Sequence, residues 1–281
     1  MRKRAVLRGA VIATVAGVLS RVLGAVYRIF LARIVGDTGM GLFQMAMPLY
    51  GAAAIVAVLG LPTGLAKVVA EQTARRDWPA VDAAVRDALR PALLGAAAMV
   101  GLIWLAAPWL AQHLLTDERV YLSLLVMPFA LVIAVFSAIL RGYFQGLQDL
   151  ATPAFAQLAE QVIRIATVLG LVRLFLPHGL AWAAAAAMMG VAAGEAAGLA
   201  VYVRRYRRSL RASRPWHAGG ARHPEAVSER RLLSLSLPVM AGGLLGAVSS
   251  MVDVVVIPRR LIFSGVQADE ATALFGQISG M

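Results

Sequence analysis

Residues 9–32 read GAVIATVAGVLSRVLGAVYRIFLA, a run whose only charged side chains are two arginines. A helix rises about 1.5 Å per residue, so about 20 residues cross the ~30 Å hydrocarbon core of a bilayer. Arg21 falls near the middle of the run, where a charge exposed to lipid costs roughly 2.5–3.5 kcal/mol. We therefore expect a first membrane span in which Arg21 faces protein or a water-filled cavity.

The composition of the whole chain is that of a membrane protein. Hydrophobic residues make up 60% of the 281 residues, charged residues make up 15%, and the mean hydropathy is +0.74. A soluble domain of this length needs far fewer apolar residues. The chain has no cysteine, and its four histidines lack acidic partners at metal-ligand spacing. We expect a polytopic membrane protein that is not an enzyme and binds neither metal nor cofactor.

Seven apolar runs, and the start of an eighth, predict an all-α fold. The expected spans are residues 9–32, 42–66, 91–115, 120–140, 153–176, 180–203 and 232–257, and an eighth segment begins at Ala271. Pro48, Gly60 and Pro62 predict a kink or hinge in the second span. Residues 67–90 are polar with helical periodicity, and Asp77 can cap a helix whose first turn holds Trp78 and Pro79 and that leads into the third span.

Basic residues gather in the connections between these runs. With the N-terminus in the cytoplasm, 19 of the 27 lysines and arginines lie on the cytoplasmic side, five lie outside and three lie within spans. The positive-inside rule therefore favours a cytoplasmic N-terminus. We expect residues 204–231 to form a basic loop against anionic lipid headgroups, not a nucleic-acid site. This loop would divide a first lobe, residues 1–203, from the start of a second lobe, residues 232–281.

A weak internal repeat supports two lobes. The pattern AG-x-L occurs at residues 16–19 and again at 241–244, each time opening a span after a basic segment. Transporters built from parallel repeats bind their substrate between the repeats. The same offset aligns Arg28 with Asp253, so we consider an ion pair between them. The chain ends inside an apolar segment, so we expect the parent protein to continue.

Three further ionisable residues lie inside the expected spans. Glu160 precedes Arg164 by four residues, the favourable order on a helix, so they form either a self-neutralising pair or part of a ligand site. Glu195 lies between Gly194 and Gly198, where small residues let helices approach closely. We expect Glu195 to be a packing or hydrogen-bond partner.

Arg21 is the strongest candidate for an anion contact, because no acid lies within four residues of it. Arg28 follows seven residues later, almost two helical turns, and projects from the same side. The planar fork of arginine binds phosphate in bidentate fashion. Because the six charges within the spans sum to zero, the expectation of a cationic cavity rests on Arg21 and Arg28.

Two segments resemble a known family. SRVLGAVYRIFLARIVG, residues 20–36, is similar to the first helix of lipid II flippases and their relatives in the multidrug/oligosaccharidyl-lipid/polysaccharide (MOP) exporter superfamily. RGYFQGLQDLATPAFAQLAEQVIRI, residues 141–165, resembles the stage V sporulation protein B and polysaccharide-biosynthesis branch. Residues 258–261 and 271–281 resemble that branch as well.

The resemblance implies two six-helix lobes around a central cavity. Alternating access would move a polyprenyl-pyrophosphate-linked saccharide from the inner to the outer leaflet, for peptidoglycan, polysaccharide or spore-cortex synthesis. Its partners would be that lipid, membrane lipids, and a coupling cation or the membrane potential. The first-helix arginine of lipid II flippases, which contacts pyrophosphate, corresponds to Arg21, but Tyr27-Arg28 replaces their Arg-Asp. The candidate substrate-binding residues are Arg21, Arg28, Gln157, Glu160, Gln161, Arg164 and Asp253.

Two alternatives stay open. A cation-coupled multidrug antiporter of the same superfamily would use Glu160 or Glu195 as its proton site. A membrane scaffold for sporulation or wall assembly would transport nothing.

Overall fold

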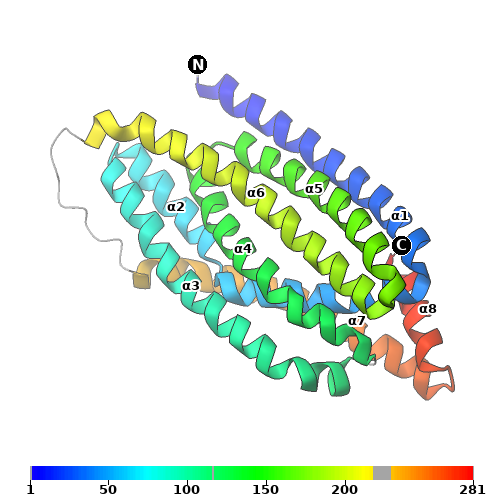
Figure 1. Cartoon of the computed structure of the whole chain (residues 1–281). Helices are drawn as coiled ribbons and strands as arrows, with labels where there is room; N and C mark the ends of the chain where they lie inside the picture. Colours follow the sequence, from blue (N-terminus) through cyan, green and yellow to red (C-terminus); the bar gives the residue numbers. More distant parts are fainter. Residues whose placement is uncertain (1, 116, 218–228, 281) are drawn as a thin grey trace.

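The computed structural model describes residues 2–115, 117–217 and 229–280, which form helices and short turns with no strand among them (Figure 1). The main helices are α1 (Arg2–Val58), α2 (Leu61–Ala74), α3 (Trp78–Trp109), α4 (Tyr121–Gly146), α5 (Ala151–Phe175), α6 (Leu180–His217), α7 (Glu229–Phe263) and α8 (Ala268–Gly280). Three short helical turns are η1 (Leu110–Leu114), η2 (Glu118–Val120) and η3 (Leu176–His178). The predicted all-α fold is confirmed.

Helix α1 contains the first predicted span and most of the second, as two arms that meet at Gly36. Gly36 has φ 69° and ψ −179°, a conformation that is essentially restricted to glycine. The chain changes direction at this residue, as the dark and light blue parts of α1 show in Figure 1. We call residues 2–35 the first arm and residues 37–58 the second arm.

The second predicted span, residues 42–66, is interrupted. Leu59 and Gly60 both have positive φ, 53° and 67°, which ends α1 and lets α2 begin. Pro62 lies in the first turn of α2, where a helix does not need its missing N–H. A side chain at Gly60 would also meet the backbone carbonyl of Ser236 in α7. The expected hinge is therefore in place, but it separates two helices.

Asp77 caps α3, as predicted. Its Oδ1 accepts the backbone N–H of Ala80 at 3.1 Å. From this cap α3 continues through Pro91 to Trp109. The helix that Asp77 caps and the third span are thus one element, whereas the polar residues 67–74 belong to α2.

Five stretches are long and apolar enough to cross a membrane: Gly9–Val58, Trp78–Leu114, Glu118–Gly146, Leu180–Arg211 and Ser236–Phe263. The first of them contains both arms of α1. Helix α5 forms where the fifth span is predicted, but Glu160 and Arg164 lower its hydropathy and it is not among the five. Arg164, one of its polar side chains, contacts Glu195 of α6.

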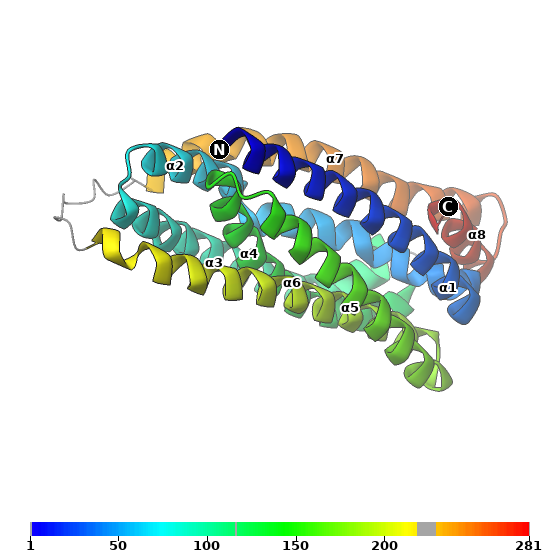
Figure 2. The same ribbon diagram turned by 90° about the horizontal axis from the view of Figure 1, so that it is seen from above.

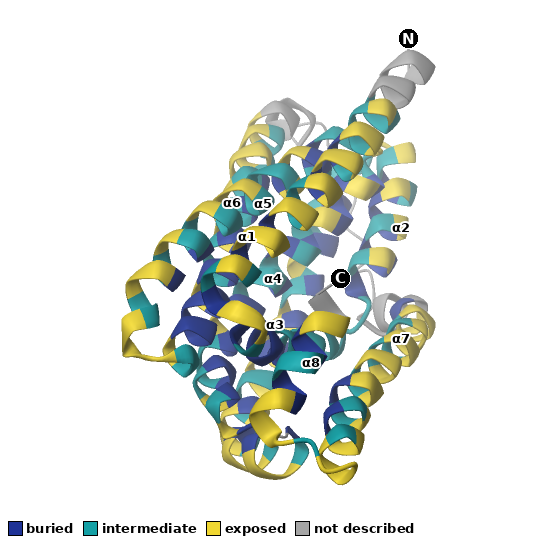
Figure 3. Ribbon diagram, turned by 90° about the vertical axis from the view of Figure 1, so that its right-hand side faces the viewer, coloured by how far each residue is buried: buried dark blue, intermediate teal, exposed yellow. Residues whose placement is uncertain are grey.

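Large apolar side chains cover the outside of the bundle. Leu94, Leu105 and Leu245 are 72%, 85% and 75% exposed, and exposed positions recur along the outer faces of the helices in Figure 3. Such a surface favours association in water, whereas hydrocarbon solvates it. The chain is therefore a multi-pass membrane protein.

The interior forms where α6 packs against α4 and α5, and α5 and α6 run side by side (Figure 2). The five alanines at residues 183–187 of α6 are each at most 5% exposed. Small side chains let helix backbones approach, and in a bilayer such packing stabilises the bundle in place of the hydrophobic effect. Helix α6 is therefore the helix around which α4 and α5 are arranged.

The predicted basic loop, residues 204–231, is helical in its first half, so the prediction of a loop is wrong there. Helix α6 continues to His217 and α7 begins at Glu229, while residues 218–228 lie outside the described part. Arginine and leucine are good helix formers, so nothing in RRYRRSLR ends the helix where the apolar run ends.

Helices α7 and α8 pack against α1. Helix α8 begins three residues before the predicted start at Ala271. Gly41 of α1 and Gly276 of α8 let the two backbones touch, because a side chain at either position would meet main-chain atoms of the other helix. Close by, Gln277 donates a hydrogen bond of 2.6 Å to Asp37.

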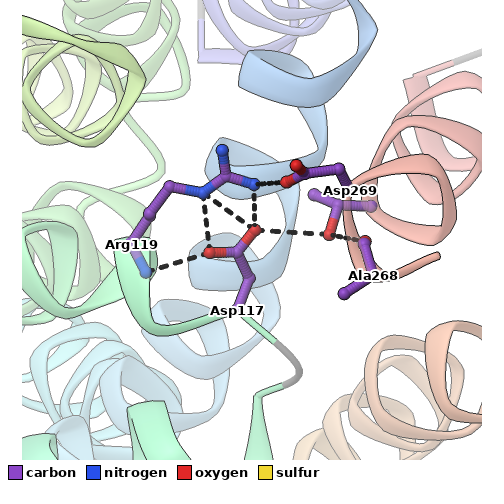
Figure 4. A network of polar contacts seen from close by, with 5 residues as sticks. Asp117, Arg119, Ala268 and Asp269 are labelled. Carbon is purple, nitrogen blue, oxygen red and sulfur yellow. Dashed lines mark hydrogen bonds and ion pairs between the residues drawn. The ribbon is translucent and has the colours of Figure 1, made fainter. Parts of the chain in front are cut away.

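A polar cluster joins α8 to the connection between α3 and α4 (Figure 4). Asp117 accepts the backbone N–H of Arg119 at 3.0 Å and its guanidinium at 2.6–3.1 Å. The hydroxyl of Thr272 donates to Asp117 at 3.4 Å, and Arg119 also reaches Asp269 at 2.5 Å. We call these four residues the Asp117 cluster.

Candidate anion-binding site

A cavity of about 160 Å³ lies between the two arms of α1, α5 and α6. Its lining comes from all four segments. The lining residues are Gly24, Tyr27, Arg28, Phe43, Gln44, Met47, Gln161, Arg164 and Val191.

Helical spacing brings the polar lining residues together. Gly24, Tyr27 and Arg28 share one face of the first arm, and Gln161 and Arg164 share one face of α5. Gly24 lies beside α5, because a Cβ there would be in ordinary contact, at 3.5 Å, with Nε2 of Gln161. Guanidinium groups from two different helices therefore border one space.

The charged side chains that line the cavity are both cations. Arg28 and Arg164 both border it, and no carboxylate is found among its described lining residues. Within the described part of the chain, the buried Nε of Arg164 and the buried hydroxyl of Tyr27 have no hydrogen-bond partner. A buried donor left unpaired costs about 1–3 kcal/mol. A bound anion could accept from these donors, which suits the cavity to a phosphate-like group.

Arg164 also lies between two carboxylates. It forms an ion pair with Glu160, as the four-residue spacing predicts. Its Nη2 lies 3.6 Å from Oε1 of Glu195 in α6. The hydroxyl of Tyr50, from the second arm, donates to that same Glu195 oxygen at 3.2 Å. Glu195 is thus a hydrogen-bond partner, as predicted.

Helices α5 and α6 approach closely at this network. A Cβ at Gly194 would lie 2.8 Å from both the Cβ of Arg164 and the backbone oxygen of Glu160. The small residue beside Glu195 therefore serves close packing, as the sequence predicts. Since the side chain of Glu195 is little exposed, its charge depends on Arg164 and Tyr50 for stabilisation.

Some of the seven predicted substrate-binding residues meet at the cavity: Arg28, Gln161 and Arg164 line it. Glu160 forms an ion pair with Arg164 but is not a lining residue. Arg21 and Gln157 are exposed on their helices and are not among the lining residues. Their contact with a ligand stays a prediction.

Asp253 lies apart from this group. It is exposed on α7, and within the described residues it forms no ion pair with Arg28. The neighbouring Val254 is only 3% exposed, and successive residues of a helix point about 100° apart, so Asp253 is turned outward. The Arg28–Asp253 pair that the repeat suggests is not formed.

Three residues at the site were not among the predicted site residues: Tyr27, Gln44 and Tyr50. Gln44 and Tyr50 carry the only hydrogen-bonding side chains between residues 42 and 58. Polar side chains so isolated in an apolar span are the signal that could have found them.

The model of the family described as "Polysaccharide biosynthesis protein" matches residues 6–266. Stage V sporulation protein B of Bacillus subtilis (strain 168) is 33% identical over 283 residues, covering all of this chain and 54% of that protein. Lipid II flippase MurJ of the same organism is 27% identical over 276 residues, covering 93% of this chain and 51% of that one. The chain thus spans about half the length of these curated relatives.

A solved structure shares the fold. It is described as the inward-facing conformation of a multidrug resistance MATE family transporter of the MOP superfamily. The TM-score is 0.64 at 14% identity, over 90% of this chain and 56% of the other. The structure shows the fold, and the match of the family model to residues 6–266 shows that the chain belongs to the polysaccharide biosynthesis protein family, as a relative of stage V sporulation protein B.

Proposed function

We propose that this chain forms the anion-binding half of a flippase for a polyprenyl-pyrophosphate-linked saccharide. The observation that carries the proposal is the meeting of Arg28 and Arg164 at one cavity whose described lining holds no carboxylate. A relative named lipid II flippase and the family's link to polysaccharide biosynthesis support the substrate class. The direction of transfer, from the inner to the outer leaflet, is the one that the family resemblance implies, and the distribution of basic residues favours a cytoplasmic N-terminus.

The size of the cavity limits which part of the lipid it holds. A cavity of about 160 Å³ has room for a phosphate-sized group but not for a whole polyprenyl-linked saccharide. Two guanidinium groups on separate helices can each form paired hydrogen bonds with phosphate oxygens. The sugar and the polyprenyl chain would then lie outside the cavity.

Binding of farnesyl pyrophosphate to the purified chain in lipid nanodiscs tests this role. We expect Arg28→Gln to weaken binding by at least about tenfold, because a hydrogen bond to a charged group contributes about 1.5–3 kcal/mol. Arg33→Gln, an exposed arginine of the same arm outside the cavity lining, is the matched control. Arg21→Gln tests whether Arg21, the residue that the family resemblance points to, also contributes to the binding of farnesyl pyrophosphate.

Equal affinity in Arg28→Gln and Arg33→Gln would overturn the proposal. Farnesol, which keeps the chain of farnesyl pyrophosphate but lacks its phosphates, should bind alike to all three variants and to the unaltered protein.

A cation-coupled multidrug antiporter is the second candidate, favoured by the carboxylates of Glu160 and Glu195 beside the cavity. Both carboxylates contact Arg164 and neither is a lining residue, so a cationic drug would meet guanidinium groups first. Binding of tetraphenylphosphonium that is lost in Glu195→Gln, without binding of farnesyl pyrophosphate, would favour this candidate.

A further inference from the structure

Behind the cavity, two carboxylates share one guanidinium. Glu160 and Glu195 come from different helices, and both approach Nη2 of Arg164. Tyr50 adds one neutral hydroxyl. With all three groups ionised, the triad of Glu160, Arg164 and Glu195 carries one negative charge in excess.

The two carboxylates are held unequally. Glu160 is the closer partner of Arg164, and its side chain is 18% exposed. Glu195 lies 3.6 Å from the guanidinium, and its side chain is 11% exposed. The carboxylate of Glu195 is therefore stabilised less by Arg164, and is less hydrated, than the carboxylate of Glu160.

Other charged and titratable groups face the triad from each neighbouring helix. Arg28 and Tyr27 of α1 border the cavity on the far side of Arg164. Arg141 of α4 donates to the hydroxyl of Tyr202 in α6 at 3.3 Å. Because Arg141 is exposed, water screens its charge. Arg164 is thus the cation that directly contacts Glu195.

We infer that Glu195 takes up a proton when an anionic phosphate group binds Arg164. The inference rests on the proposed function, because the phosphate is the group that competes for the guanidinium. When phosphate oxygens pair with the guanidinium of Arg164, the carboxylate of Glu195 loses its counter-ion. One proton from water then binds a Glu195 oxygen and leaves a neutral carboxylic acid, which Tyr50 can still hydrogen bond.

Linkage makes this coupling reciprocal. If binding takes up one proton, the affinity for the anion depends on pH. It falls by up to about tenfold for each pH unit above the range in which Glu195 of the free protein is already protonated. A proton supplied from one side of the membrane would thereby favour loading of the anionic lipid on that side.

The test measures proton uptake with a pH-sensitive dye while farnesyl pyrophosphate is added to the purified chain in weakly buffered solution. Inorganic pyrophosphate, added separately, shows whether the lipid or the free anion is the ligand. We expect close to one proton per bound molecule in the unaltered protein. Glu195→Gln should take up none and should bind with an affinity that no longer depends on pH. Glu118→Gln, an exposed glutamate outside the triad, should behave like the unaltered protein.

Binding without proton uptake, or equal uptake in Glu195→Gln, would overturn the inference and leave the anion site intact. Absence of any binding would instead contradict the proposed function.

A second measurement needs no ligand. Infrared spectra recorded across a pH series should show a protonated-carboxyl band that is present in the unaltered protein at mildly acidic pH and missing in Glu195→Gln.

Discussion

At the scale of single residues, Gly194 determines how closely α5 and α6 pack. We expect Gly194→Ala to lower the melting temperature, because its Cβ would lie 2.8 Å from atoms of Arg164 and Glu160 and would push the helices apart. Overpacking of this kind typically costs about 1–3 kcal/mol. Gly17→Ala is the control, since nothing lies within 4 Å of a Cβ there and alanine favours helix by up to about 1 kcal/mol. Thermal unfolding in detergent compares them; equal melting temperatures would contradict the packing argument.

Only some contacts of single residues at the cavity can be predicted from the sequence. The Glu160–Arg164 pair follows from a spacing of four residues within one helix. The bond from Tyr50 to Glu195 joins residues 145 positions apart, and no local pattern encodes it. Arg21 and Arg28 look equivalent in sequence, yet only Arg28 lines the cavity, because a rotation of the first arm decides which arginine reaches α5.

At the scale of elements, the bend at Gly36 sets the two arms of α1 in different directions. We expect Gly36→Ala to destabilise the protein by about 1–3 kcal/mol, because an alanine at this φ and ψ is strained. The effect comes from the backbone alone, since a Cβ at Gly36 would have no neighbour within 4 Å. Gly51→Ala in the second arm has equal space and no positive φ, so it should be at least as stable as the unaltered protein in chemical denaturation. A stable Gly36→Ala variant would argue against strain at the bend.

The hydropathy of the sequence predicts where nearly every helix lies, but it does not predict the residue at which each helix ends. Apolar runs report which segments enter the bilayer, and they predicted the positions of α3, α4, α6 and α7. Helix ends depend on backbone conformation instead. The break at Gly60 needs two residues with positive φ, and the extension of α6 into the basic segment needs only residues that tolerate a helix. Neither changes the hydropathy of the chain.

At the scale of the whole molecule, α8 is joined to the first six helices by contacts with α1 and by the Asp117 cluster. The surface members of the cluster contribute little, because the side chain of Asp269 is 77% exposed and water screens its pair with Arg119. Asp117 is 8% exposed and accepts several hydrogen bonds. We therefore assign the stabilising role to Asp117. The two-lobe arrangement itself was implied by family resemblance and not by any one of these contacts.

Asp117 makes the docking of α8 dependent on pH. Burial alone would raise the pKa of Asp117, but hydrogen bonds from Arg119 outweigh burial and lower this pKa below its ordinary value. A carboxylate with a lowered pKa stabilises the folded state above the ordinary pKa of aspartate, about 3.9, and loses that contribution as the pH falls through its own lower pKa. The contact of α8 should therefore be constant near neutral pH and weaken only in strong acid.

The chain has no cysteine, so spin labels can be attached to Glu118→Cys and Glu270→Cys without removing native thiols. We expect a narrow distance distribution between the labels at neutral pH, and a broad one in Asp117→Asn, because an amide cannot replace the ionic bonds to Arg119. Asp269→Asn should stay close to the unaltered protein, since it removes only the exposed pair. If Asp269→Asn broadened the distribution as much as Asp117→Asn, the surface pair and not the buried carboxylate would hold α8 in place.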